Sequence, residues 1–438
     1  MPAVRHLAVV SLLVGTALAV PTGATAAEPA NLFTVSNAAD GSAGNDSSVA
    51  GSVSSDGRVV TFTSAATNLL PDGSGHRQVY VRDGVDGPLT RASVGPDGAP
   101  GQGDSSSATL SADGRYVAFQ STAADLVTGD TNGVSDVFVR DRVGATTTRV
   151  SVVVDGTEGN GESITPTVSA DGRFVVYSSR ATNLAPGSTG TALRVLVHDR
   201  ESGTTTEASV RPDGSSGSVN YSAATISADG RYVAFGAHSR DLAPVAGASS
   251  LYTAYIRDMQ AGTTTRIDGR TPGRMLVSFG SAVSISSDGR YVTFAAAFSG
   301  LTTTDSITNV LRYDRITRQS RVVSAGLGGA PANKSSTTYL SGYGPAISAD
   351  GRYVLFASDA SNLVTGDTNG VADVFLRDLT SGTTRRLNTT PAGVESTVGY
   401  PGVHRGSIAG DGSVAVFDTY APLLGPSTYR NNVFLRQP

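Results

Sequence analysis

The sequence contains no cysteine and no tryptophan, and Lys334 is the only lysine among its 438 residues. Without cysteine the chain forms no disulfide, thiolate zinc site or iron–sulfur cluster, and it has no cysteine nucleophile. A single lysine leaves little room for Schiff-base chemistry or a phosphate-binding P-loop. The net charge is only −4, so the composition lacks the basic excess typical of proteins that bind nucleic acid or anionic membranes.

Motifs of common catalytic sites are absent as well. The chain has no G-x-S-x-G nucleophile elbow, no H-E-x-x-H helix and no glycine-rich phosphate loop. Four histidines follow the first 27 residues, and one of them, His198, stands where other repeats described below have arginine, which favours a structural role. These absences argue against a catalytic triad.

The first 27 residues have the pattern of a secretory signal peptide. Arg5 and His6 precede an apolar run, Leu7–Val20, and small residues follow up to Ala26 and Ala27. As a helix this run spans about 21 Å, short of the ~30 Å hydrocarbon core of a membrane. We therefore expect residues 1–27 to be removed, and residues 28–438 to form one soluble, secreted domain without a membrane span.

Two sequence motifs recur seven times in phase. The first, of the form S-x-D-G-R-Y-V-x-F, has its aspartate at Asp56, Asp113, Asp171, Asp229, Asp288, Asp350 and Asp411. The second, of the form V-F-V-R-D, ends at Asp83, Asp141, Asp199, Asp258, Asp314, Asp378 and, in altered form, Gln437. Self-similarity at a fixed period is the signature of a repeat architecture.

Each repeat has the pattern of four short strands. In the second repeat we predict strands at Ala108–Ser111, Tyr116–Ser121, Val137–Arg140 and Thr148–Val152, with a tight turn at Asp113 and a longer polar loop. Four antiparallel strands in a unit of about 58 residues are typical of a β-propeller blade. The sequence therefore predicts an all-β fold, a seven-bladed β-propeller of four-stranded antiparallel blades.

The two ends of the chain are expected to close the ring. The last repeat stops after its third strand, Val433–Arg436, and lacks a fourth. Phe33–Ser36 resembles a fourth strand, but the first three strands of its repeat are missing. The N-terminal strand should therefore complete the C-terminal blade.

An arginine and an aspartate recur at positions that should meet. The arginine after each Asp-Gly begins a second strand, the aspartate of the other motif ends a third strand, and antiparallel pairing brings these two ends together. We expect six ion pairs: Arg58–Asp83, Arg115–Asp141, Arg173–Asp199, Arg231–Asp258, Arg290–Asp314 and Arg352–Asp378.

The unit Ser111–Phe119 and its copies resemble the WD-like repeats of TolB-type β-propellers, and the resemblance extends over residues 32–438. It implies the propeller fold. The N-terminal α/β domain of TolB itself has no counterpart in this sequence, so the resemblance does not extend to the role of TolB in the cell envelope. The usual S-P-D-G of the family is S-A-D-G or S-S-D-G here, a change that a turn tolerates.

Two acidic loops are candidate calcium sites. The motif D-T-N-G-V-x-D supplies Asp130, Asn132 and Asp136 in the second repeat, and it recurs in the sixth as Asp367, Asn369 and Asp373. Oxygen ligands at such alternating positions suit a hard cation, which makes Ca²⁺ the one candidate cofactor. An Asn-Gly turn with Asx hydrogen bonds explains the same residues without a metal, and both interpretations stay open.

The long loops are expected on one face of the ring, because the short Asp-Gly turns lie on the other. The candidate binding residues lie in the loops that enter each blade: Asp46, Asp104, Glu162, Tyr221, Phe279, Tyr339, Tyr343, Tyr400 and His404. Aromatic residues on loops suit sugar stacking or a protein contact. The alternative is that they fill the central channel.

These features predict an exported, monomeric, non-catalytic propeller that binds a protein or a cell-wall or extracellular glycan on its long-loop face, with no nucleic acid partner. The alternative is a carbohydrate-active enzyme, either a polysaccharide lyase or a glycoside hydrolase, that uses the same axial groove. Such an enzyme would need paired carboxylates, or a set of histidine, arginine and carboxylate groups, at the axis.

Overall fold

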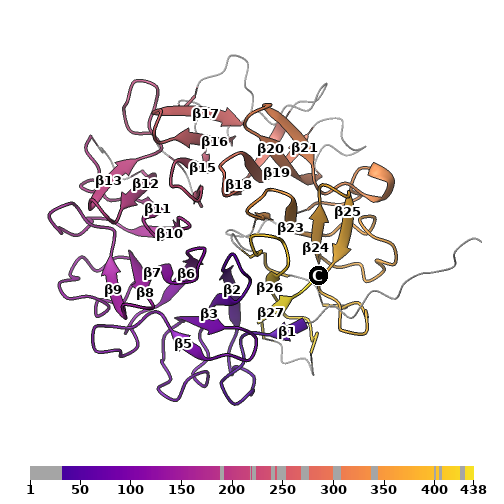
Figure 1. Cartoon of the computed structure of the whole chain (residues 1–438), viewed down its shortest axis with the longest axis horizontal. Helices are drawn as coiled ribbons and strands as arrows, with labels where there is room; N and C mark the ends of the chain where they lie inside the picture. The colour runs from indigo at the N-terminus through magenta and orange to yellow at the C-terminus, as the bar shows by residue number, and fades with distance from the viewer. Residues whose placement is uncertain are drawn as a thin grey trace, which may run out of the picture.

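The computed structural model describes residues 32–187, 192–217, 219, 223–237, 242–243, 253–267, 276–298, 307–336, 344–398, 401–403, 407–424 and 430–438, with backbone only at 276–281 and 298. Seven antiparallel sheets stand around a central axis, and the chain follows the ring once from its indigo start to its yellow end (Figure 1). The predicted seven-bladed β-propeller is confirmed. None of the described residues belong to a helix that is long and apolar enough to cross a lipid bilayer.

The strands are numbered in chain order and grouped here by blade. Blades 1 to 3 contain β2 (Ser48–Val53), β3 (Val59–Ser64), β4 (Gln78–Asp83) and β5 (Leu89–Arg91); β6 (Ser105–Leu110), β7 (Tyr116–Ser121), β8 (Asp136–Asp141) and β9 (Thr146–Arg149); and β10 (Ser163–Val168), β11 (Phe174–Ser179), β12 (Arg194–Asp199) and β13 (Thr204–Glu207). Blades 4 to 6 contain β14 (Thr225–Ile226), β15 (Tyr232–Ala237), β16 (Thr253–Asp258) and β17 (Thr263–Ile267); β18 (Leu276–Ile285), β19 (Tyr291–Phe298), β20 (Thr308–Asp314) and β21 (Gln319–Val322); and β22 (Ala346–Ile347), β23 (Tyr353–Ser358), β24 (Asp373–Asp378) and β25 (Thr383–Arg386). Blade 7 contains β26 (Ala415–Thr419), β27 (Asn432–Arg436) and β1 (Leu32–Thr34), and one short 3₁₀ helix, η1 (Leu327–Gly329), follows β21.

The N-terminal strand completes the last blade, as predicted. β1 pairs with β27 in the order Leu32↔Arg436, Phe33↔Leu435 and Thr34↔Phe434, and the two strands lie together in Figure 1. The innermost position of this blade holds isolated bridges, one of them between Ile408 and Ala415, instead of a full strand. The ring is therefore closed by pairing of the two ends of the chain.

The recurring serine, aspartate and glycine build the turn between the first and second strands. In blade 2, Ser111 Oγ donates to Asp113 Oδ1 at 2.6 Å and accepts from the Tyr116 amide at 2.9 Å. The Arg115 amide also donates to Asp113 Oδ1, at 3.0 Å. Gly114 has a φ of +72°, a conformation that favours glycine. These short turns and those between the third and fourth strands form the short-turn face, and the longer connections form the long-loop face.

The residue between serine and aspartate in each turn joins the blades to one another. Its amide donates to the carbonyl of the same residue in the next blade at 2.8 to 3.3 Å, which closes a ring of seven hydrogen bonds through Ser55, Ala112, Ala170, Ala228, Ser287, Ala349 and Gly410. Proline, which the TolB-type repeats have here, lacks the N–H that this ring requires. The change from S-P-D-G is therefore more than a tolerated turn substitution, because it supplies seven hydrogen bonds between blades.

The hydrophobic core lies between neighbouring blades. The described residues form seven buried clusters, one at each interface between blades. The cluster that closes the ring joins Val60 and Phe62 of blade 1 to Val416 and Val433 of blade 7. Each blade therefore depends on its neighbours for a core, as expected for a repeat protein.

Five of the six predicted ion pairs are present, with N–O distances of 2.7 to 2.8 Å in blades 2 to 6. In blade 1 the prediction is wrong, because Asp83 pairs with Arg142 of blade 2 while Arg58 reaches only Asp56, at 3.9 Å. In the other five blades the arginine lies over the aromatic ring of the next residue, as Arg115 does over Tyr116. Val59 offers no such ring, so nothing fixes Arg58 beside Asp83.

Strand boundaries in blade 2 were also predicted wrongly: the first strand is Ser105–Leu110 and not Ala108–Ser111. The fourth strand of blade 2 ends at Arg149 and does not continue to Val152. The Val150 amide still donates to Val137, but the chain then turns into the loop that leads to blade 3. This early end brings Arg149 to the edge of the long-loop face, beside the acidic loop of the same blade.

Candidate functional site

The predicted binding residues of the long-loop face fall into two groups. Tyr221, Tyr339, Tyr343, Tyr400 and His404 lie outside the described residues, and only the backbone of Phe279 is described, in β18. Asp46, Asp104 and Glu162 lie in described loops of blades 1 to 3. Their role in binding a partner stays a prediction.

The three described acidic residues each have a local partner. Asp46 accepts the amide of the residue that follows it. Asp104 accepts the Arg77 amide at 2.9 Å, and Glu162 pairs with Arg180 Nε at 2.7 Å. All three side chains remain at least partly exposed, so they shape the charge of the face without forming a buried acid–base pair.

The acidic loop of blade 6 contacts an arginine from the outermost strand. Arg386 Nη1 lies 3.3 Å from Asp367 Oδ1 and 3.4 Å from Asp373 Oδ2, and it also donates to Glu395. The side chains of Asp367 and Asp373 are only 3% and 1% exposed. A guanidinium thus occupies the place among the carboxylates where the sequence suggested a metal ion.

Blade 2 repeats this arrangement. Arg149 Nη1 lies 3.1 Å from Asp130 Oδ1, 2.9 Å from Glu158 Oε2 and 3.8 Å from Asp136 Oδ2. We call each group of three carboxylates and one arginine an acid–arginine cluster. Two blades far apart in the ring therefore share one buried arrangement, built by the same motif.

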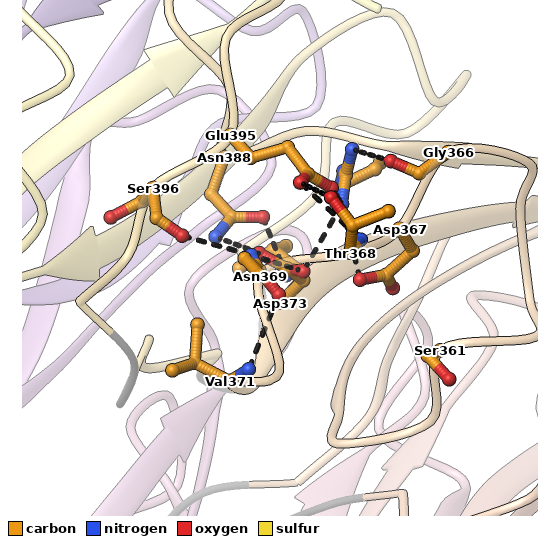
Figure 2. A network of polar contacts seen from close by, with 12 residues as sticks. Ser361, Gly366, Asp367, Thr368, Asn369, Val371, Asp373, Asn388, Glu395 and Ser396 are labelled. Atoms are coloured by element: carbon orange, nitrogen blue, oxygen red, sulfur yellow. Dashed lines mark hydrogen bonds and ion pairs between the residues drawn. The ribbon is translucent and has the colours of Figure 1, made fainter.

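The rest of the motif fixes the loop around the cluster. In blade 6, Thr368 donates to Glu395 from both its amide and its hydroxyl, and Asn369 Nδ2 donates to Asp373 at 2.9 Å (Figure 2). The Val371 amide donates to Asn369 Oδ1 at 3.2 Å, which is the Asx turn of the second interpretation. Gly370 has a φ of +72°. The loop geometry is therefore accounted for by hydrogen bonds within the protein.

The charges in each cluster do not balance, since three carboxylates face one guanidinium. Burial raises the pKa of Asp130, Asp136, Asp367 and Asp373 above the usual range of a carboxyl group. Glu395 differs, because hydrogen bonds from Thr368 lower its pKa to about 2. The glutamate is thus the ionised partner of the arginine, and the two aspartates carry charge at a cost.

The arginine and the glutamate of each cluster were not among the site residues predicted from the sequence. Both recur at the same place in repeats 2 and 6, so alignment of the repeats would have found them. Blade 3 shows a further signal, because Arg194 stands at the position of Asp136 and Glu207 at the position of Arg149. The two charges are exchanged between the strands there, which indicates that these positions interact.

Calcium binding by these loops stays a prediction. Within the described ranges, no group of three acidic or histidine side chains is arranged to hold a metal ion. A bound ion would have to share the aspartates with Arg149 or Arg386 or to displace these side chains. The excess of two negative charges per cluster is the feature that favours a divalent cation.

We expect millimolar Ca²⁺ to raise the melting temperature of chelator-treated residues 28–438 by a few degrees. A ligand at 100 times its dissociation constant stabilises by about 2.7 kcal/mol per site. Asp130→Ala combined with Asp367→Ala should remove the response, and Asp46→Ala, on an exposed loop, should leave it intact. If calcium causes no shift in melting temperature, or an equal shift in the double variant, these loops do not bind calcium. Arginine is then the only positive partner of their carboxylates.

The described histidines do not form a catalytic arrangement. His198 lies in β12, is buried, and contacts Thr205 Oγ1 through Nδ1 at 3.0 Å. Burial lowers its pKa to about 4. His76 is partly exposed and lies 3.8 Å from Asp104. These contacts agree with the structural role expected for His198.

Comparison with known proteins yields structural matches only. No protein family model matches the sequence, and neither does any curated protein. An oligogalacturonate lyase in complex with manganese is 12% identical, with a TM-score of 0.53 over 93% of this chain and 96% of that chain. The β-propeller domain of the Trilobed protease from Pyrococcus furiosus is also 12% identical, with a TM-score of 0.52 over 89% and 95%.

TolB from Acinetobacter baumannii is 13% identical, with a TM-score of 0.42 over 78% of this chain and 65% of that chain. This chain therefore spans less than two thirds of the length of TolB. Two of these proteins are enzymes or parts of enzymes by their descriptions. At 12% identity, the similarities to the lyase and to the protease domain establish a fold and no activity: the chain is a β-propeller of the kind found in these two proteins.

Proposed function

We propose that this protein is an exported propeller that binds a protein or a glycan on its long-loop face without catalysing a reaction. The observation that carries the proposal is that the loops of this face are held in place before any partner arrives. In blade 1, Asn45 exchanges hydrogen bonds with the loop between the second and third strands: Nδ2 donates to Thr67 Oγ1 and Oδ1 accepts the Thr67 amide.

The same pair of loop-to-loop hydrogen bonds recurs in two more blades. Asn160 of blade 3 contacts Thr182 in the same way, and Asn333 contacts Ser361 ahead of blade 6. Each pair of hydrogen bonds fixes two exposed loops to each other. A surface whose loops are ordered in advance loses less conformational entropy on binding, which is a property of effective recognition surfaces.

A carbohydrate-active enzyme is the second candidate function. The similarity to an oligogalacturonate lyase over 93% of this chain favours a sugar substrate if the protein is an enzyme. The acid–arginine clusters do not support this function directly, because their carboxylates lie at the outer strands and are satisfied by arginine and threonine.

The test uses residues 28–438 on a glycan array and in pull-down from cell-envelope extract. We expect one partner class to be retained, and Asp104→Ala with Glu162→Ala to weaken retention. The matched control is Arg58→Gln, which removes one exposed charge from the short-turn face. Loss of binding only in the control, or no binding at all, would contradict the proposal. Release of unsaturated or shortened sugar from a bound glycan would establish the enzyme instead.

A further inference from the structure

Three arginines meet at the interface between blades 5 and 6, on the short-turn face. Arg312 in β20 and Arg321 in β21 are directly opposite each other in the antiparallel register. Side chains at such positions lie on the same face of the sheet, about 5 Å apart at Cβ. Arg377 lies near the end of β24 in the neighbouring blade (Figure 1).

The two arginines of blade 5 reach across the interface. Arg312 Nη1 donates to the Gly351 carbonyl at 2.6 Å, and Arg321 Nη1 donates to the Leu379 carbonyl at 3.0 Å. Both acceptors belong to blade 6, one before and one after Arg377 in the sequence. Arg377 itself donates from Nη1 to Thr384 Oγ1 at 2.7 Å. Each of the three guanidinium groups is thus held by a neutral acceptor, and that of Arg312 also lies over the Tyr291 ring, 4.1 Å from its centroid.

No ion pair joins this cluster to an acidic side chain within the described part of the chain, although the charges of Asp314 and Asp378 favour the ionised forms of Arg312 and Arg377. The nearest carboxylates in sequence, Asp314 and Asp378, already accept two hydrogen bonds each from Arg290 and Arg352. Burial, together with repulsion from Arg321, lowers the pKa of Arg312 and Arg377. The Nε atom of Arg377 is buried and donates to no acceptor among the described residues. Three positive charges therefore stand without an ion-pair partner of their own in a protein whose net charge is −4.

The corresponding groove between blades 1 and 2 is hollow. It is an open groove of about 450 Å³, whose lining includes Val81, Thr90 and Arg140 and also Arg91 and Arg142. The first three occupy the positions of Arg312, Arg321 and Arg377 in the repeat. Blades 5 and 6 therefore keep the arginine of position 140 and replace Val81 and Thr90 by arginine, whereas Arg91 and Arg142 of the first groove have the neutral counterparts Val322 and Leu379.

We propose that Arg312, Arg321 and Arg377 bind an oxyanion group of a ligand, either a phosphate or a carboxylate. The planar guanidinium offers paired donors that match both groups. The Nε and Nη2 atoms of Arg312 and Arg321 make no hydrogen bond within the described residues, so they are available as donors. This site lies on the opposite face from the long loops, so it is independent of the function proposed above.

The experiment is a thermal shift and calorimetric titration of residues 28–438 at low ionic strength. The probes are inorganic phosphate and galacturonate, with chloride at matched ionic strength as the control. We expect phosphate, galacturonate or both to raise the melting temperature by about 2–5 °C at saturation, beyond the chloride value. A response to phosphate alone identifies a tetrahedral oxyanion, and a response to both identifies oxyanions in general.

Arg321→Gln tests the site with little risk to folding, because this side chain is exposed. It should weaken binding about tenfold or more, since a charged hydrogen-bond donor is lost. Its melting temperature without the anion should equal or exceed that of the wild type, because repulsion is relieved. Arg321→Lys should keep part of the affinity, and Arg58→Gln, which removes one charge elsewhere on the same face, should keep all of it. Equal shifts with chloride, or equal weakening by Arg58→Gln, would overturn the proposal.

Discussion

Replacing Arg149 by methionine is expected to lower the free energy of unfolding by about 3–5 kcal/mol, the cost of removing one partner from a buried ionic group. Its side chain is 8% exposed, and those of Asp130 and Asp136 are 6% and 0% exposed. Without the guanidinium, these carboxylates would keep their burial and lose their one positive neighbour. Urea unfolding at neutral pH measures the loss.

Asp136→Asn is the matched control, and we expect it to be close to neutral. Burial raises the pKa of Asp136, which means that the folded protein disfavours its charged form. Asn309 occupies the same position in β20 of blade 5, where it is buried and accepts from Ser324 Oγ at 3.4 Å, as Asp136 accepts from Ser151. Asp136→Asn combined with Arg149→Met should recover part of the stability, because it removes one unpaired charge.

The effect of Arg149→Met should depend on pH in a defined direction. A carboxyl whose folded pKa is raised binds its proton more tightly in the folded than in the unfolded state, so stability increases as pH falls through the folded pKa. Loss of the arginine raises the pKa of Asp130 and Asp136 further. The destabilisation should therefore be smaller at about pH 5 than at about pH 8. An equal loss at both pH values would show that packing, and not charge, is what Arg149 contributes.

The parts of the fold that the sequence predicted are those encoded locally. The Ser-x-Asp-Gly turn is completed by hydrogen bonds among residues at most five positions apart, such as Ser111 to Tyr116, so each turn is visible in its own segment. Closure of the ring could be predicted because Phe33–Ser36 repeats the fourth-strand spacing that precedes the turns at Asp113, Asp171 and Asp229. Neither inference needs knowledge of how blades pack.

What the sequence did not show depends on contacts between blades or across strands. The pair Arg58–Asp83 failed because Arg142, from the next blade, takes Asp83. The calcium interpretation considered spacing along one loop, whereas Arg386 comes from β25, 13 residues after Asp373. The hydrogen-bonded ring was overlooked for the same reason, since the amide of Ala228 meets the carbonyl of Ser287 only when two turns stand side by side.

The same side-by-side packing makes the glycine of each turn a contact between blades. Gly172 has a φ of +79°, and a Cβ placed on it would lie 2.0 Å from Cδ2 of Tyr116 in the preceding blade. The Tyr116 ring has little freedom to move, because Arg115 and Arg200 lie over it at 4.8 and 4.5 Å from its centroid. Any side chain at position 172 must therefore push two blades apart.

We expect Gly172→Ala to lower the free energy of unfolding by about 3 kcal/mol, the sum of a left-handed backbone penalty and an overpacked contact. Gly156→Ala is the matched control, since Gly156 has a φ of +87° and nothing lies within 4 Å of its added Cβ. That variant should lose only about 1 kcal/mol, the backbone cost alone. The difference between the two, measured by urea unfolding, isolates the packing of blade 3 against blade 2. Equal losses would mean that the turn can move away from Tyr116, and that the blades are held together mainly by the hydrogen-bonded ring and the buried clusters.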